Sequence, residues 1–226
     1  GGALLGDRVR MQEHALDPEV YIRSMASRGH LGGLAWTTPQ AIRVLDAAGC
    51  EVVLVETVGV GQSEVEIAGL ADTTIVLLAP GMGDGIQAAK AGILEIGDVF
   101  VVNKADRDGA DATVRDLRHM ISLGDRTEPG LWRPPVCKTV ASRGEGLDEV
   151  MEAIDKHEAW LDATGTRHTR RLRRASDEIE AIALAALRAR MGDLRAGHGI
   201  AEHAAAVVAG TTDPYAAADD VVAHLA

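Results

Sequence analysis

The sequence has few aromatic residues and few cysteines, and each shortage argues against a class of protein. Phe, Trp and Tyr together make up 3% of the 226 residues, which argues against a binding surface of stacked aromatic rings. Cys50 and Cys137 lie far apart and have no second cysteine nearby, so they do not form a zinc-binding pattern. We expect two buried, reduced thiols. The eight histidines show no metal-ligand spacing, so we expect no transition-metal site.

Long apolar runs and an excess of positive charge are also lacking. The apolar runs are far shorter than the about 20 residues that span a bilayer, and residues 1–6 do not resemble a signal peptide. We therefore expect a cytoplasmic protein. The formal net charge of −11 argues against nucleic acid or an anionic membrane as a partner, since both require clustered cations. The five arginines between residues 167 and 174 are expected to form a solvated or intersubunit ion-pair face with the acids that follow.

A third absence concerns phosphate binding. The pattern Gly-x-x-x-x-Gly-Lys-Ser/Thr occurs nowhere in the 226 residues. In P-loop proteins this loop cradles the phosphates with backbone N–H groups, while its lysine bridges them and its hydroxyl binds Mg²⁺. The chain begins with the glycine-rich segment Gly1–Gly6 and not with Met, and we expect it to be part of a longer protein.

Short apolar runs rich in β-branched residues alternate with helical stretches from about residue 49 onward. The runs are Glu51–Val55, Thr74–Leu78, Val99–Val102 and Val136–Val140. Among the helical stretches between them are Asp84–Leu94 and Asp111–Ser122. Strands buried on both faces show such runs, and their alternation with helices predicts an α/β fold with a mostly parallel sheet flanked by helices.

The chain changes character after Gly146. Leu147–Leu161 is predicted to be the last helix of the α/β domain, which we place at residues 1–162. Residues 163–226 are predicted to form a helical arm, with one long Ala-rich helix followed by two short helices. Such an arm has few core residues of its own, which is typical of a segment that packs against another chain.

The sharpest motif is Asn103-Lys104-Ala105-Asp106, directly after the run Val99–Val102. Open α/β sheets bind ligands at the carboxyl ends of their strands. The carboxylate of Asp106 can accept two parallel hydrogen bonds from the ring N–H and the exocyclic amine of guanine, and adenine offers no such pair of donors. The aliphatic part of Lys104 can cover one face of the base, and Asn103 can tie neighbouring loops together. The motif predicts a guanine site; the alternative is a polar turn without a special role.

Two further run ends can contribute to the same site. The backbone N–H of Ala141, after Val136–Val140, can donate to the guanine carbonyl oxygen. The carboxylate of Glu56 can lie near Mg²⁺, directly or through water, and Gly59 allows its N–H to approach a γ-phosphate. The alternatives are an ordinary polar loop at Ala141 and a helix-capping carboxylate at Glu56.

Asp7 and Lys90 are candidates for the phosphate end of such a site. Asp7 follows the glycine-rich start and can be a second carboxylate at the metal, although an Asp after Gly is also typical of a turn. Lys90 follows the glycine-rich segment 80–85, whose composition suits a moving loop. It can balance charge that develops on a phosphate, or it can simply be exposed to solvent.

Together these motifs resemble the MeaB/ArgK family of P-loop GTPases. The resemblance is carried by Leu5–Met11, Val55–Glu64, Pro80–Asp84 and Val102–Asp106, in this order. Glu56 in the pattern Glu-x-x-Gly is the diagnostic detail, because most GTPases have Asp there. The resemblance covers essentially the whole chain. Gly85 departs from it, since the family pattern has an acidic residue at this position.

The resemblance implies a P-loop NTPase-type fold and a GTPase that binds GTP or GDP with Mg²⁺. It also implies a chaperone of adenosylcobalamin-dependent methylmalonyl-CoA mutase, which gates cofactor loading and protects the mutase, and a homodimer formed through the C-terminal arm. By position it assigns catalysis to Lys90 and Glu56, Mg²⁺ to Asp7 and Glu56, and the nucleotide to Asn103, Lys104, Asp106, Ala141 and Gly59.

In this family the phosphate-binding loop lies N-terminal to the stretch that matches residue 1. We therefore expect the intact protein to hydrolyse GTP and the 226-residue chain to be impaired. The alternative from another class is a non-enzymatic fragment that dimerises or docks on a partner through residues 167–226. A nickel-inserting GTPase is disfavoured because Cys50 and Cys137 have no Cys or His neighbours to bind the metal.

Overall fold

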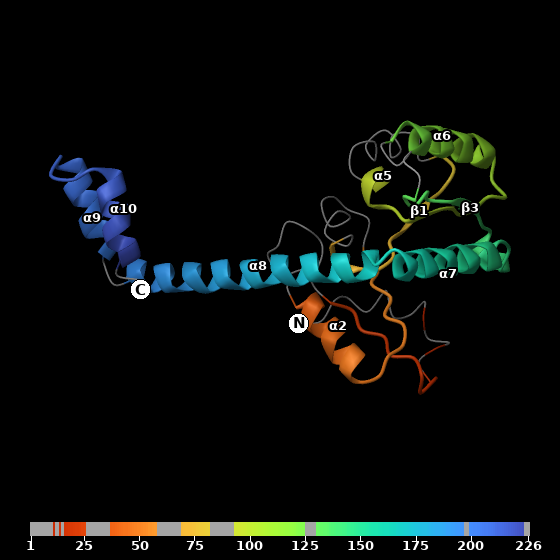
Figure 1. Ribbon diagram of the computed structural model, residues 1–226, viewed down its shortest axis with the longest axis horizontal. Coiled ribbons are helices and arrows are strands. Elements are labelled where there is room, and N and C mark those ends of the chain that lie inside the picture. Colours follow the sequence, from red (N-terminus) through yellow and green to blue (C-terminus); the bar gives the residue numbers. More distant parts are fainter. Residues whose placement is uncertain are drawn as a thin grey trace. The chain divides into compact units, whose positions relative to one another are not determined.

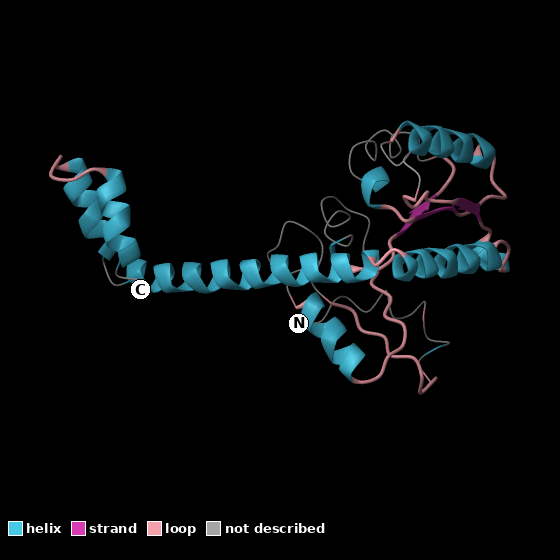
Figure 2. Ribbon diagram, in the orientation of Figure 1, coloured by secondary structure: helices cyan, strands magenta, loops and turns pink. Residues whose placement is uncertain are grey.

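The computed structural model describes residues 11, 14, 16–25, 37–57, 69–81, 93–124, 130–196 and 199–223. They form two compact units, the first ending at Arg170 and the second beginning at Arg171. The elements, shown in Figure 1 and Figure 2, are α2 (Thr38–Ala47), β1 (Ile75–Leu78), α5 (Ile93–Ile96), β2 (Val99–Val102), α6 (Ala110–Leu123), β3 (Val136–Lys138), the 3₁₀ helix η3 (Ala141–Arg143), α7 (Leu147–Ala163), α8 (Thr166–Ala196), α9 (Gly199–Val208) and α10 (Pro214–Ala223).

The sheet has three parallel strands in the order β1-β2-β3. Ile75 of β1 pairs with Val99 of β2, and Phe100 pairs with Val136 of β3. Helix α5 lies between the first two strands in the sequence and α6 between the last two. Parallel strands need such crossover connections, so the structure confirms the predicted α/β fold class.

The strand β2 is buried on both faces. Successive side chains of a strand point to opposite faces of the sheet. Phe100 and Val102 accordingly belong to a core cluster with residues of α6, and Val99 and Val101 belong to a second cluster with Ala153 of α7. Figure 1 shows α6 and α7 on opposite sides of the sheet. This double burial is why the sequence of β2 is an unbroken apolar run.

The prediction of a strand at Glu51–Val55 is wrong. Residues 52–57 form neither a helix nor a strand. The side chains of Val52 and Leu54 are 75% and 89% exposed. β-Branched residues favour a strand only where a neighbouring strand and a packing surface are available. No strand among the described residues pairs with this run. The predicted helix Asp84–Leu94 lies, apart from its last two residues, outside the described part of the chain.

A buried carboxylate, Asp98, precedes β2 at the end of the sheet opposite the Asn103 motif. Its side chain accepts hydrogen bonds from the backbone N–H of Thr74 (3.0 Å) and from both terminal nitrogens of Arg170 (3.0 and 3.2 Å). His157 Nε2 lies 3.4 Å from Asp98 Oδ1. Burial acts to raise the pKa of Asp98, but His157, Arg170 and the Thr74 N–H outweigh it and hold the pKa below its ordinary value.

Three aromatic rings pack together next to Asp98. Trp132 donates from Nε1 to the backbone carbonyl oxygen of Asp98 at 2.7 Å. The fully buried ring of His157 packs against two indoles, with its centroid 4.8 Å from that of Trp132 and 5.7 Å from that of Trp160, and the indole centroids are 5.8 Å apart. Its Nδ1 forms a hydrogen bond with the hydroxyl of Thr73 at 2.9 Å. These contacts attach α7 and the beginning of α8 to the sheet.

The arginines at the beginning of α8 do not all form the solvated or intersubunit face predicted for them. Arg170 binds the buried Asp98, and Arg167 pairs with Asp162 at 2.5 Å. Arg173 lies 3.9 Å from Asp177 and is exposed, which fits the predicted ion-pair face. The acid that binds Arg170 therefore lies 72 residues away in the sequence and not among the acids that follow the arginines.

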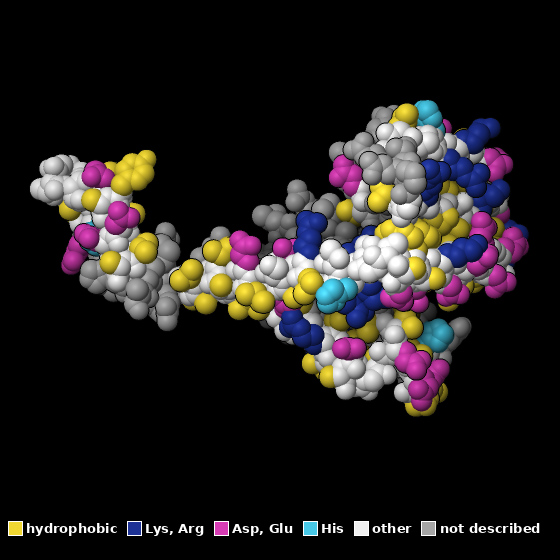
Figure 3. Space-filling model, viewed as in Figure 1, with side chains coloured by type: hydrophobic (Ala, Val, Ile, Leu, Met, Phe, Trp, Pro, Cys, Tyr) yellow, Lys and Arg dark blue, Asp and Glu magenta, His cyan; other side chains and the backbone are white. Residues whose placement is uncertain are grey.

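The second unit contains the remainder of α8 together with α9 and α10, which contact each other and bury Ala217. Large apolar side chains of α8 are exposed, and Figure 3 shows apolar groups along this helix. They are Leu172, Ile179, Ile182, Leu184 and Leu187, between 44% and 68% exposed. None of the helices in the described residues is long and apolar enough to cross a membrane.

Gly146 provides a test of backbone packing beside β3. Its φ is 76°, and a Cβ there would lie 2.1 Å from the carbonyl oxygen of Lys138. Gly146→Ala should lower the free energy of unfolding by about 2–4 kcal/mol. Part of this loss comes from the left-handed backbone conformation, and part comes from the overlap of the new Cβ with the carbonyl oxygen of Lys138. Gly144→Ala is the control, because φ is 72° but nothing lies within 4 Å of the new Cβ. It should cost only about 1 kcal/mol. Equal losses in urea unfolding would contradict this account.

The Asp98 cluster predicts a pH dependence of stability. The pKa of Asp98 is lower in the folded protein than in the unfolded chain, where it is about 3.9. The ionised carboxylate therefore stabilises the folded protein fully above the unfolded-state pKa, and this stabilisation is lost as the pH falls through the folded-state pKa. Asp98→Asn should lower the free energy of unfolding by about 1.5–3 kcal/mol at pH 7, because Arg170 loses a charged hydrogen-bond acceptor. The difference between the two proteins should shrink below about pH 4. A difference that is constant with pH in urea unfolding would show that the charge is not what stabilises the cluster.

Candidate functional site

The motif Asn103-Lys104-Ala105-Asp106 lies directly after β2, as predicted from the sequence. Backbone hydrogen bonds join it to both neighbouring strand ends. The N–H of Asn103 donates to the backbone carbonyl oxygen of Leu78 in β1 at 2.8 Å. The N–H of Ala105 donates to the backbone carbonyl oxygen of Thr139, after β3, at 3.0 Å. The carboxyl ends of all three strands are thereby held together, which is where open parallel sheets bind their ligands.

The side chain of Asn103 links two loops. Its Oδ1 accepts hydrogen bonds from the N–H of Lys104 (2.8 Å), the N–H of Ala141 (3.1 Å) and the hydroxyl of Thr139 (3.2 Å). Thr139 is buried, so this end of the network is shielded from water. The loop after β2 and the loop after β3 are therefore fixed to each other, which is the linking role predicted for Asn103.

Ala141 has a structural role that the sequence did not predict. Its N–H donates to Asn103 Oδ1, so donation to a base carbonyl oxygen would share one N–H between two acceptors. Ala141 is the first residue of η3 and is exposed. The residue thus lies beside the motif, but its N–H already stabilises the loop.

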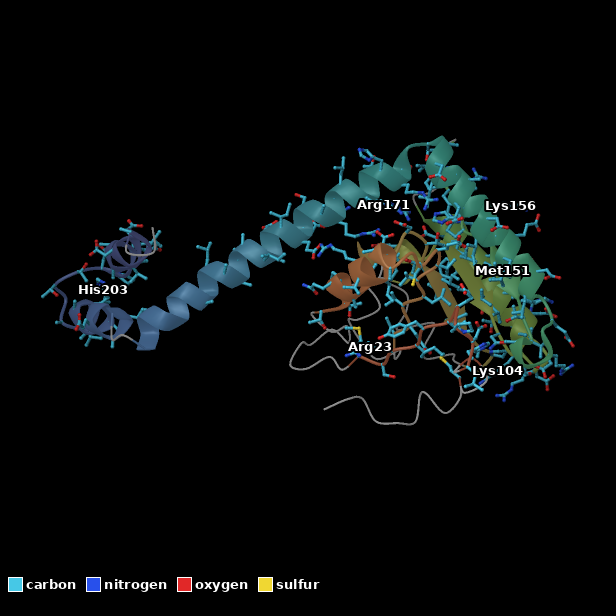
Figure 4. All side chains as sticks on the ribbon, turned by 90° about the horizontal axis from the view of Figure 1, so that it is seen from below. Arg23, Lys104, Met151, Lys156, Arg171 and His203 are labelled. Carbon is cyan, nitrogen blue, oxygen red and sulfur yellow. The ribbon has the colours of Figure 1, made fainter. Side chains whose placement is uncertain are left out.

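Lys104 has an unusual backbone. Its φ is 57°, and it is the only residue other than glycine with a positive φ in the described part of the chain. A left-handed conformation costs a side-chain-bearing residue about 1–2 kcal/mol and often marks a functional site. The side chain of Lys104 is exposed, and Figure 4 shows the residue at one end of the sheet. The strained turn lies between Asn103, which binds the β3 loop, and Asp106, which carries the carboxylate.

Asp106 is paired across the two loops. Arg143 Nη2 donates to Asp106 Oδ2 at 2.7 Å, and Arg143 Nη1 donates to Glu145 Oε1 at 3.4 Å. The Asp106 side chain is 39% exposed, so its carboxylate remains open to a ligand from solvent. Sequence reasoning missed Arg143 because nothing in a local pattern indicates an ion pair over 37 residues.

Two open hollows flank Asp106. One, of about 270 Å³, is lined by residues that include Thr139 and Gly146, and the other, of about 440 Å³, is lined by residues 105–112 and Arg115. Neither is lined by Asn103 or Lys104. Both hollows are instead lined by Ala105 and Asp106, so they open on the second half of the motif.

The remaining predicted residues are not brought to the motif by the described structure. Asp7, Gly59 and Lys90 lie outside the described residues. Glu56 is described and exposed, and a carboxylate oxygen is the kind of ligand that Mg²⁺ prefers. No group of three or more His, Cys, Asp or Glu side chains that could hold a metal ion occurs in the described ranges.

The two cysteines are free thiols. Cys137 is buried in β3, as predicted, whereas Cys50 is only half-buried. Burial raises the pKa of the Cys137 thiol, and the nearby Glu149 acts in the same direction. Cys137 is therefore a packing residue of the sheet.

Comparison with known proteins gives concordant matches. Residues 1–194 match the family described as methylmalonyl-CoA mutase-associated GTPase MeaB. A Pyrococcus abyssi protein that bears a GTPase name is 46% identical and covers 100% of this chain and 70% of its own length. The GTPase ArgK of Escherichia coli is 39% identical over 73% of this chain and 50% of ArgK.

Two further matches agree with these. The mouse mitochondrial homolog of the methylmalonic aciduria type A protein is 38% identical over 73% of this chain and 40% of its own length. A crystal structure of a LAO/AO transport system kinase superposes with a TM-score of 0.59 at 27% identity, over 83% of this chain and 61% of that one. The chain thus spans between 40% and 70% of the length of these sequence relatives.

The backbone of Lys104 predicts that a glycine at this position is more stabilising than an alanine. Lys104→Gly should raise the free energy of unfolding by about 1 kcal/mol relative to Lys104→Ala, because glycine adopts φ 57° without strain. Elsewhere, alanine is normally the more stabilising of the two residues. Urea unfolding of both variants measures the difference, and a more stable alanine variant would show that the turn is not strained.

Proposed function

The chain belongs to the MeaB family of methylmalonyl-CoA mutase-associated GTPases, and from this premise we propose that it carries the guanine-recognition site of a GTP-hydrolysing protein. The observation that supports this most directly is the network at the end of β2. Asn103 joins two loops through two hydrogen bonds and accepts a third from Lys104 in its own loop, and Asp106 presents a partly exposed carboxylate beside them.

In the proposed complex, Asp106 recognises the base. Its two oxygens accept hydrogen bonds from the ring N–H and the exocyclic amine of guanine, and adenine offers this carboxylate no such pair of donors. The aliphatic part of Lys104 covers one face of the base. The N–H of Ala141, shared with Asn103, is proposed to donate to the base carbonyl oxygen.

The phosphate end of the site is proposed from the family resemblance. Asp7 and Glu56 would hold Mg²⁺, which when bound neutralises negative charge on the phosphates. The N–H of Gly59 would contact the γ-phosphate, and Lys90 would stabilise the charge that develops during hydrolysis. These roles belong to the catalysis proposed for the whole protein.

We also propose a partner and an assembly. The family name and the mouse relative support methylmalonyl-CoA mutase as the partner, with the nucleotide cycle gating adenosylcobalamin loading and protecting the enzyme. The exposed apolar side chains of α8 support a homodimer formed through residues 163–226. A purely non-enzymatic docking role is not favoured, because the matched family and the named ArgK relative are GTPases.

Asp106→Asn tests the assignment of the base-binding residue. The amide offers one acceptor and one donor, which matches xanthine better than guanine. GDP affinity should fall by about 10–100-fold, since a hydrogen bond to a charged group contributes about 1.5–3 kcal/mol. XDP affinity should rise. Calorimetric titration of the chain with GDP, XDP and ADP in the presence of Mg²⁺ measures the change.

Asp108→Asn is the matched control for this experiment. Asp108 is exposed and lies two residues further along the same loop, so this substitution makes the same charge change and should leave GDP affinity unaltered. Unchanged GDP affinity in Asp106→Asn would show that Asp106 does not contact the base. Equal affinity of the unsubstituted chain for GDP and ADP, or no binding of either, would contradict the proposed function.

A further inference from the structure

We propose that Arg143 determines guanine specificity by holding the Asp106 carboxylate in the orientation that the base requires. This inference rests on the function proposed for Asp106. Arg143 would not touch the base and is therefore a positioning residue.

The geometry shows how Arg143 would act. One guanidinium bridges a carboxylate after β2, Asp106, and a carboxylate after β3, Glu145. Arg143 belongs to η3, whose first residue, Ala141, is bound by Asn103. The two loops are therefore joined at two points, by the asparagine and by the arginine. A guanidinium with a carboxylate partner for each terminal nitrogen has fewer orientations open to it, and this restricts the Asp106 oxygen that it binds.

The specificity argument depends on the plane of the carboxylate. The terminal torsion of an aspartate side chain is broad, so an exposed carboxylate samples many orientations. Two parallel hydrogen bonds to a base require both oxygens to lie in the plane of the donors. Restricting the rotation of the carboxylate before binding removes an entropic cost of binding. Only a ligand with both donors requires this one orientation, so only such a ligand gains from the restriction.

The contact with Arg143 leaves room for the base. Arg143 donates to Oδ2 alone, whereas a fork bound to both oxygens would compete with guanine. A carboxylate has about four lone-pair positions, so Oδ1 and the second position on Oδ2 can still accept hydrogen bonds.

Arg143→Gln tests the proposal with two nucleotides that differ by one donor. IDP lacks the exocyclic amine of GDP and so can make only one of the two hydrogen bonds to Asp106. In calorimetric titrations of the 226-residue chain with Mg²⁺, GDP should bind about three- to fivefold more weakly to the variant, the range expected for loss of an exposed ion pair. IDP affinity should stay nearly the same. The preference for GDP over IDP should therefore fall by the same factor.

Two variants make the test specific. Arg143→Lys keeps a charged donor for Asp106 but cannot bridge both carboxylates, so it should restore part of the preference. Lys156→Gln is the matched control, since it removes one positive charge from an exposed ion pair with Glu152 (2.7 Å) on α7. Figure 4 shows Lys156 well away from Lys104, so this variant should leave both affinities unchanged.

Each other outcome would overturn the proposal. An equal loss of GDP and IDP affinity in Arg143→Gln would indicate that Arg143 merely supports the loop. An unchanged preference would show that it has no role in base recognition, and tighter GDP binding would show that it competes with the base. If the unsubstituted chain did not prefer GDP over ADP, the proposed function itself would fail, and this is measured before any Arg143 variant is made.

Discussion

The burial of β2 is the constraint on which the rest of the first unit depends. Its four residues are at most 3% exposed, and the strand has a hydrogen-bonded neighbour on each side and a helix on each face. A shift by one residue would send Phe100, a large and fully buried side chain, to the opposite face. The register of β2 is therefore strongly fixed. Because Asp98 precedes the strand and Asn103 follows it, the positions of both polar groups are fixed by the packing of apolar residues between them.

The two ends of the sheet have different physical roles. At the amino end, the buried Asp98 is bound by Arg170, His157 and the Thr74 N–H, and these contacts attach the first residues of α8 to the sheet. At the carboxyl end, Asn103 is bound to the neighbouring loop while Asp106 remains accessible to solvent. Removing a buried ion pair partner is far more costly than removing a partly exposed one. Stability is thus concentrated at one end, and polar groups at the other can change with less effect on folding.

The sequence predicts those features that depend on local pattern. The apolar runs gave three of the strands, and the position of Asn103 directly after one of them gave the location of the site. The predicted strand at Glu51–Val55 failed because strand formation also requires a partner, which composition does not encode. Arg143 and Arg170 were missed for a related reason. Their carboxylate partners lie 37 and 72 residues away, and only the fold brings them together. The left-handed backbone of Lys104 was equally hidden, since lysine has no preference for it.

The position of the tryptophans has an optical consequence. The chain contains three tryptophans, and two of them, Trp132 and Trp160, pack against His157 and against each other at the amino end of the sheet. Indole emission responds to the polarity and to the quenching groups in its immediate surroundings. The fluorescence of these two rings therefore reports on the junction with α8, and not directly on events beside Asp106. A nucleotide that altered their emission would have transmitted its effect along the full length of β2.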